Sequence, residues 1–152
     1  FGLKKFATEE EKKKKEEKDK SMKMSERLNL YKDRQRNNLS ENAYGAIVRL
    51  RMDNSHPLGF GYDKEYLSLK LRNRRYAYLE SGWNVGTTQD STSIVSGFVG
   101  FKAKQNFRES LVFGVEEIGR GSVVYMVDNP LFRGFWYNGK LLFGNAIFLV
   151  GN

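Results

Sequence analysis

The sequence predicts an α/β protein in which a long charged helix precedes a layered mixed sheet with helices around it. Three observations support this fold class. Residues 48–52 and 66–71 alternate apolar with polar or basic side chains, which is typical of half-exposed strands. Residues 138–150 are apolar nearly all round, which is typical of a helix buried between layers. Residues 8–21 hold no apolar side chain, which indicates a solvated segment ahead of the folded part.

The leading segment is predicted to form one helix that ends near residues 37–38. Thr8 with a glutamate three residues later matches a capping box. Several glutamates stand four residues before a lysine, and each such pair stabilises an exposed helix by about 0.2–0.5 kcal/mol. An apolar stripe at helical spacing follows, made by Met24, Leu28 and Tyr31. We therefore expect the helix to be exposed in its first half and docked in its second.

Beyond this helix the pattern changes to strands separated by turns. The candidate strands are residues 46–52, 66–71, 76–79, 93–99, 111–118 and 122–127. The fourth and fifth of these are apolar enough to be buried, and the last has the strongest strand pattern. Gly119 and Gly121 on either side of Arg120 supply the backbone freedom that a hairpin turn needs. Residues 53–59 have the composition of a loop.

Two further features complete the expected fold. Trp83 is predicted to be a packed aromatic residue followed by a turn. Pro130 is well placed to begin a helical turn. In the final helix, Gly144 and Ala146 would allow other elements to approach closely. We therefore divide the chain into a charged N-terminal helix or connector, residues 1–37, and an α/β accessory domain, residues 38–152.

Composition excludes several classes of site. The chain has no cysteine and one histidine, so it offers no thiol nucleophile and no thiolate metal site. No apolar run reaches the length of about 18 residues that a membrane-spanning helix requires. The chain begins at Phe1 rather than at a methionine and opens on a charged run, so we expect it to be a piece of a longer protein.

The net charge of +8 suggests a nucleic-acid partner, but its distribution weakens that interpretation. Residues 1–36 carry 13 basic and 8 acidic side chains, which gives +5, and the remaining 13 basic and 10 acidic side chains give +3. Most of the excess therefore lies on the leading segment, where charges of both signs alternate. We do not expect nucleic acid to be the main partner.

Two positions stand out as candidate binding residues. His56 is the single histidine, and its place in a loop before Pro57 favours a structural role over zinc ligation. Arg133 lies among aromatic residues, an arrangement on which single-stranded nucleic acid or an acidic peptide can stack. The neighbouring aromatic residues are Phe132, Phe135, Trp136 and Tyr137. The alternative for Arg133 is that the aromatic residues are core and the guanidinium pairs with a carboxylate such as Asp128.

A known catalytic motif is not found. No Gly-x-Ser-x-Gly elbow supports a serine hydrolase, although serines and aspartates are common enough for an unrecognised Ser/Asp site. The segment around Arg120 lacks the pattern of a phosphate-binding loop and precedes a strand rather than a helix.

From about Ser25 onward, the sequence resembles the C-terminal region of large bacterial zinc carboxypeptidases related to carboxypeptidase A. The segments that carry the resemblance are residues 43–48, 53–61, 83–86, 96–100 and 119–150. Within the last of them, Asp128-Asn129-Pro130-Leu131-Phe132-Arg133 and Gly139-Lys140-Leu141-Leu142-Phe143-Gly144-Asn145-Ala146 are the most specific. The resemblance depends on the order of the whole set more than on any one short segment.

This resemblance implies a class I glutamine amidotransferase-like fold and a periplasmic or secreted location. It also implies that zinc is bound by a His-x-x-Glu pair in a peptidase domain upstream. His56 is followed by Pro57-Leu58-Gly59, so no catalytic or metal residue is carried over to this chain. An amidotransferase would need a nucleophilic cysteine, which the chain lacks.

The leading hypothesis is therefore a non-catalytic accessory domain that contacts the upstream peptidase domain and needs no cofactor of its own. Its candidate binding residues are Phe132, Arg133, Trp136 and His56. An exposed aromatic patch at Phe132, Phe135 and Trp136 would mark a lost domain interface or a homodimer contact. The alternative hypothesis is a basic module that binds nucleic acid or another polyanion.

Overall fold

The computed structural model describes residues 30–74, 76–89 and 93–151. The chain falls into two compact units, Phe1–Asn37 and Asn38–Asn152. The short helix η1 (Tyr31–Asp33) lies in the first unit, and helix α2 (Arg34–Glu41) begins there. Neither helix has a buried residue, and Tyr31 is 81% exposed. The rest of the expected charged helix, with Met24 and Leu28, lies outside the described residues.

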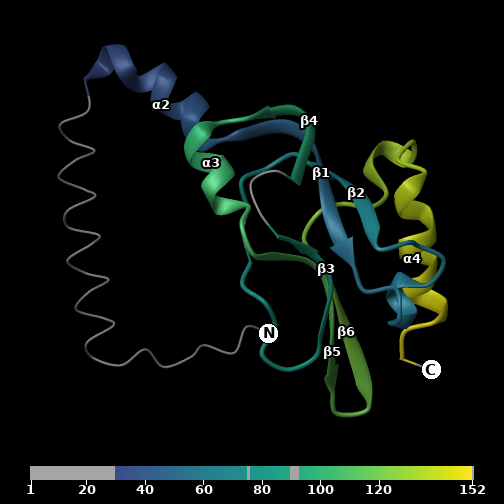
Figure 1. The fold of residues 1–152 in the computed structure, drawn as a ribbon. Coiled ribbons are helices and arrows are strands. Elements are labelled where there is room, and N and C mark those ends of the chain that lie inside the picture. Colours follow the sequence, from purple (N-terminus) through teal and green to yellow (C-terminus); the bar gives the residue numbers. More distant parts are fainter. Residues whose placement is uncertain (1–29, 75, 90–92, 152) are drawn as a thin grey trace, which may run out of the picture. The chain divides into compact units, whose positions relative to one another are not determined.

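The second unit is built around a six-stranded sheet in which every pairing between described strands is antiparallel (Figure 1). Its strands are β1 (Ala43–Met52), β2 (Glu65–Lys70), β3 (Trp83–Thr88), β4 (Ile94–Val99), β5 (Ser110–Ile118) and β6 (Gly121–Met126). Their order is β2-β1-β3-β5-β6, and β4 pairs with β1. The molecule is thus a mixed α/β protein with a curled antiparallel sheet. The expectation of a mixed sheet is wrong for the described strands.

Strand β1 organises the sheet because it is long enough to pair with three neighbours. β2 pairs with one edge of β1 from Ala46 to Arg51. On the other edge, the first half of β1 pairs with β4 and its last two residues pair with β3. Along β1, alternate side chains are buried while Arg49 and Arg51 remain exposed. This is the alternation that the sequence predicts for a half-exposed strand.

Among the described residues that follow α2, the helices of this unit are few and short. They are η2 (Pro57–Gly59), α3 (Phe101–Asn106), η4 (Phe132–Gly134) and α4 (Asn138–Phe148). α4 lies beside β2 and contacts both β2 and η2 (Figure 1). The predicted helix at residues 138–150 is confirmed, but its burial between layers is wrong. Only Gly139, Leu142 and Asn145 of α4 are buried, because nothing in the described chain covers its outer face.

Several local expectations also need correction. Residues 83–86 belong to strand β3 rather than to a turn, and Trp83 is 44% exposed. Residues 76–79 do not form a strand, although the amide of Leu111 donates to the carbonyl of Tyr76. β4 is a strand as predicted, but its central residues are exposed because the strand lies on the sheet periphery and pairs with β1 alone among the described strands.

The hydrophobic core lies where β1, β2 and β5 face helix α4 and the residues that follow α3. The ring of Tyr66 packs edge-on against Phe113 of β5, with the ring centroids 5.3 Å apart. Val48, Leu50 and Leu142 belong to the same buried cluster and are fully buried. Residues 119–120 form the predicted hairpin turn between β5 and β6, with Gly119 in the left-handed region at φ 65°. This hairpin and the end of α4 border the cleft described next.

Candidate functional site

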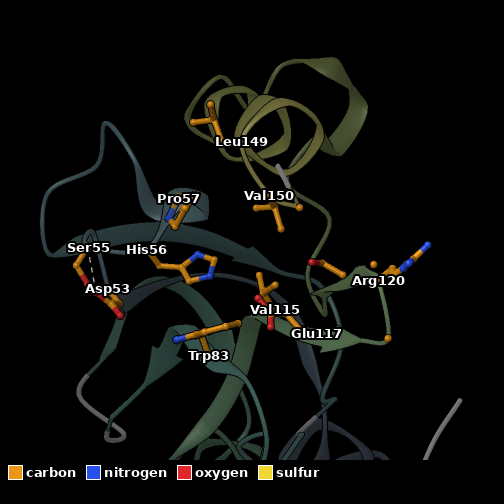
Figure 2. A pocket seen from close by; sticks show the side chains of 14 residues that line it. Asp53, Ser55, His56, Pro57, Trp83, Val115, Glu117, Arg120, Leu149 and Val150 are labelled. Atoms are coloured by element: carbon orange, nitrogen blue, oxygen red, sulfur yellow. Dashed lines mark hydrogen bonds between the residues drawn. The ribbon is translucent and has the colours of Figure 1, made fainter.

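The candidate site is a cleft of about 510 Å³ between the loop that follows β1, the β5–β6 hairpin and the segment after α4. Its polar side chains come from Asp53, Ser55, His56, Glu117, Arg120 and Ser122. Its apolar wall is made by Pro57, Trp83, Val115, Leu149 and Val150. Figure 2 shows the imidazole of His56 directed into this cleft above the indole of Trp83. The two ring centroids are 5.4 Å apart and the rings are tilted by 48°.

The local chain orients His56, and its surroundings favour the neutral form of the ring. It precedes η2, and its Nδ1 accepts a hydrogen bond of 3.0 Å from the amide of Leu58. Burial lowers the pKa of His56, and the nearby Asp53 carboxylate opposes this only in part. The neutral ring therefore keeps its lone pair on Nδ1 and its proton on Nε2. In this state His56 offers the cleft a hydrogen-bond donor rather than a general base.

Asp53 and Ser55 are bonded to each other rather than to His56. The amide and the hydroxyl of Ser55 both donate to Oδ1 of Asp53, at 3.0 and 2.6 Å. The hydrogen bond from the Ser55 side chain is the main reason why the pKa of Asp53 is lowered. A hydrolytic triad needs the histidine between the serine and the acid. These three residues therefore form a stabilised loop and not a charge-relay arrangement.

Arg120 stands at the tip of the β5–β6 hairpin, where its side chain is exposed. In Figure 2 this side chain extends away from His56, at the outer border of the cleft. Glu117 lies on the same hairpin and is also exposed. The cleft thus combines one aromatic platform, one fixed donor and charged groups of both signs at its border. Such a combination suits binding of a ligand, because a few polar groups orient it while apolar walls hold it.

The other predicted site residues lie elsewhere in the fold. The guanidinium of Arg133 lies 5.2 Å from the centroid of the Phe132 ring, and Phe132 packs edge-on against Phe135 at 5.7 Å. Arg133 does not pair with Asp128 as one alternative proposed, because Asp128 forms a buried ion pair with Lys70. Phe132, Arg133 and Phe135 are therefore brought together as predicted by their spacing, but they do not line the His56 cleft.

Trp136 lines a second cleft, of about 420 Å³, between the outer edge of β2 and the start of α4. We call this cleft the aromatic groove; its lining residues are Glu65, Tyr66, Leu67, Phe135, Trp136, Tyr137 and Asn138. The importance of Tyr66 and Trp83 did not emerge from the sequence. Tyr66 shares one face of β2 with Ser68 and Lys70, and that two-residue spacing was the available signal. Trp83 gave no comparable signal, since it meets His56 only in the folded chain.

Histidine and acidic side chains do not gather into a metal site in the part of the chain that the structure describes. No group of three or more of them there could hold a metal ion. Among the same residues, no helix is both long and apolar enough to cross a membrane.

The chain was compared with protein families, curated proteins and solved structures. No protein-family model matches the chain, and neither the curated proteins nor the solved structures include a significant match.

Proposed function

We propose that this chain is a non-catalytic accessory domain of a secreted or periplasmic zinc carboxypeptidase-like metallopeptidase, where it recognises a partner or substrate. The proposal begins from the ordered sequence segments, of which residues 119–150 are the most specific. In such a protein the zinc, its ligands and the general base belong to a peptidase domain upstream. This chain would then supply binding surface and support rather than chemistry.

The observation that carries the non-catalytic part is the arrangement of the loop at His56. Nδ1 of His56 is occupied by the amide of Leu58, and the hydroxyl of Ser55 donates to Asp53. The residues that could have formed a hydrolytic site are thus used to stabilise the loop. The donor on His56 and the aromatic surface of Trp83 are open to the cleft, which favours a binding role.

The outer face of α4 supports a position beside another domain. Phe143 and Ile147, which are four residues apart on this face, are 38% and 55% exposed, although both are large and apolar. Apolar patches of this kind on an isolated domain commonly mark a protein interface. The upstream peptidase domain is the partner we propose for this face, and a second copy of the chain is the alternative occupant. The resemblance also implies a glutamine amidotransferase-like fold, which we retain as part of the proposal.

The first test is an activity measurement on this chain with zinc supplied. Blocked dipeptides with a free C-terminal carboxylate should release no C-terminal residue. Hydrolysis that disappears in His56→Asn would contradict the non-catalytic assignment.

The second test adds the peptidase domain encoded upstream of this chain, which should bind it. Ile147→Lys should weaken that binding, because it places a charge on the outer face of α4. The exposed Val123→Lys on the β5–β6 hairpin is the matched control and should leave binding unchanged. Failure of the two parts to bind would contradict the accessory role.

A second candidate function, binding of nucleic acid or another polyanion, rests on the contact between Arg133 and Phe132. Arginine next to an aromatic ring can contact a phosphate while a base stacks on the ring. Binding of labelled single-stranded RNA should then be strong at low salt and weaken steeply as salt is added. Absence of binding at low salt, or equal binding by Arg133→Ala, would exclude this function.

A further inference from the structure

His56 is joined to the start of η2 by a hydrogen bond that only the neutral imidazole can form. Its Nδ1 accepts from the amide of Leu58 at 3.0 Å. Because the neutral ring already carries a proton on Nε2, a second proton must bind at Nδ1, which then becomes a donor. Two donors cannot share a hydrogen bond, so protonation of His56 breaks this contact.

The charged ring cannot stay where the neutral ring lies. Leu58 is fully buried, so water reaches its amide only when the imidazole leaves its place. A buried amide without an acceptor is costly, which favours movement of the ring. The rest of η2 has separate anchors, because Nδ2 of Asn145 donates to the carbonyl oxygens of Leu58 and Phe60, at 3.1 and 2.7 Å. The movement therefore falls on residues 53–56, ahead of η2.

A counter-charge for the protonated ring lies in the same loop. Three charged side chains line the cleft into which the imidazole points, and they belong to Asp53, Glu117 and Arg120. Arg120 extends away from His56 in Figure 2, and Glu117 is exposed on the hairpin. Within the described chain, β3 and the segment after α4 add only uncharged side chains to the cleft. Asp53 is the group whose negative charge favours the protonated form of His56.

Asp53 has to exchange partners to receive the ring. Its Oδ1 accepts from the amide and the hydroxyl of Ser55, at 3.0 and 2.6 Å. An imidazolium adds an attraction between opposite charges that a neutral hydroxyl does not supply. The loop thus has two alternative hydrogen-bonding patterns, and the charge of one ring selects between them.

We propose that residues 53–56 form an acid-sensitive switch at the His56 cleft, in which protonation moves the His56 ring from the Leu58 amide to the Asp53 carboxylate. The neutral ring lies above Trp83, with the ring centroids 5.4 Å apart, and its Nε2–H is open to a ligand (Figure 2). The charged ring leaves this place, so the cleft loses its fixed donor and changes shape. The inference goes beyond the proposed accessory role and does not depend on it.

The test is an NMR titration of the complete chain, labelled with ¹⁵N, from pH 8 to pH 4.5. Because His56 is the single histidine, the signals of its ring nitrogens are unambiguous. We expect a proton on Nε2 and none on Nδ1 at pH 8. As the ring titrates, the amide signals of Leu58 and Ser55 should shift with the same midpoint. The protection of the Leu58 amide against hydrogen exchange, corrected for the intrinsic effect of pH, should fall about tenfold or more.

Two variants separate the switch from a simple titration. In His56→Asn the side chain can still accept from the amide of Leu58 but does not titrate, so the protection of this amide should not change with pH. In Asp53→Asn the ring loses its counter-charge, so its midpoint should move to lower pH and the Leu58 signal should follow. The pKa of Asp53 is depressed below 3.8, so the wild-type carboxylate stays ionised over the titrated range.

The inference is overturned if the Leu58 amide keeps its protection while the ring titrates, or if Nδ1 carries the proton at pH 8. Equal midpoints in Asp53→Asn and the wild type would also contradict it. The amide of Leu111, which donates to the carbonyl of Tyr76, is the internal control. Loss of its protection at the same midpoint would mean that the chain unfolds as a whole rather than switches. None of these measurements involves zinc or an upstream domain, so this inference and the proposed function fail separately.

Discussion

At the scale of single residues, the strongest constraint is the ion pair between Lys70 and Asp128. The two side chains are 1% and 9% exposed, and Nζ of Lys70 lies 3.2 Å from Oδ1 of Asp128. The hydroxyl of Ser68 donates to the same carboxylate at 2.8 Å, and the ring of Phe107 faces the ammonium at 5.3 Å. These contacts tie the segment after β6 to strand β2. They thereby fix the start of the segment that leads to Phe135–Asn138 in the aromatic groove.

Removing one member of this pair should be strongly destabilising. Asp128→Ala leaves the Lys70 ammonium buried without its counter-charge, which costs about 3–5 kcal/mol in the free energy of unfolding. The exposed pair of Arg49 and Glu65, 3.3 Å apart, is the matched control. Arg49→Ala should cost at most about 1 kcal/mol, because water already solvates both groups. Urea unfolding measures both values, and equal losses would contradict the role of burial.

His56 should make the stability of the chain depend on pH in a defined range. Its pKa in the folded chain lies below the value of 6.5 expected when unfolded, because burial disfavours the charged ring. The unfolded chain therefore binds the proton more readily, and stability falls as pH drops from about 6.5 toward the folded pKa. Above that range this contribution is fully present.

His56→Asn separates this effect from that of the neighbouring acid. Asparagine can still accept from the amide of Leu58 but does not titrate. The fall in melting temperature between pH 7 and pH 5 should therefore be smaller in the variant. The stabilisation from Asp53 is constant between these two pH values, because its pKa is depressed below 3.8 and that contribution is lost only at lower pH. An identical pH profile in both proteins would contradict the assignment.

At the scale of elements, α4 shows why a sequence pattern can predict an element and still give its surroundings wrongly. The apolar run 138–150 predicts the helix correctly. The same run predicts burial on all sides, yet only Leu142 among its large apolar residues is buried. An apolar pattern shows that a helix surface favours burial. It does not show whether the covering surface belongs to the same domain or to another one. The proposed neighbouring domain accounts for this difference.

Two glycines of α4 should respond in opposite ways to alanine. Gly139 is buried, and a Cβ there would clash with the backbone carbonyl of Pro130, so Gly139→Ala should destabilise the chain. Gly144 lies in the helix interior, and a Cβ there would meet no atom of a neighbouring element within 4 Å. Gly144→Ala should therefore stabilise the chain by about 0.5–1 kcal/mol. Thermal unfolding compares the two variants. A loss of stability in Gly144→Ala would indicate that this face of α4 is covered.

The strands show how far alternation alone can reach. It located β1, β2, β5 and β6, because each places alternate or continuous apolar residues against one core. It did not locate β3 at Trp83, since a glycine and polar residues interrupt the pattern there. The His56 cleft could not be predicted from the sequence either. His56 was a candidate because it is the single histidine, but its contact with Trp83 joins β3 to a loop that is distant in sequence. Long-range pairing, and not local pattern, decides such contacts.

At the scale of the whole molecule, the division between Asn37 and Asn38 defines what should fold alone. The buried hydrophobic residues of the described chain all lie between Ala43 and Leu142, within the second unit. A core of this kind supports cooperative two-state unfolding in a domain of this size. The charge of the two segments also differs, since most of the excess positive charge precedes Asn37.

A chain that begins at Asn38 should therefore unfold in one transition, at a denaturant midpoint close to that of the complete chain. The slope of its unfolding free energy against urea concentration should stay similar. This slope depends on the surface that unfolding exposes, and the core is retained. The same truncation removes the charge of the leading segment, so any binding of RNA should weaken. Loss of cooperative unfolding would mean that the leading segment completes the core.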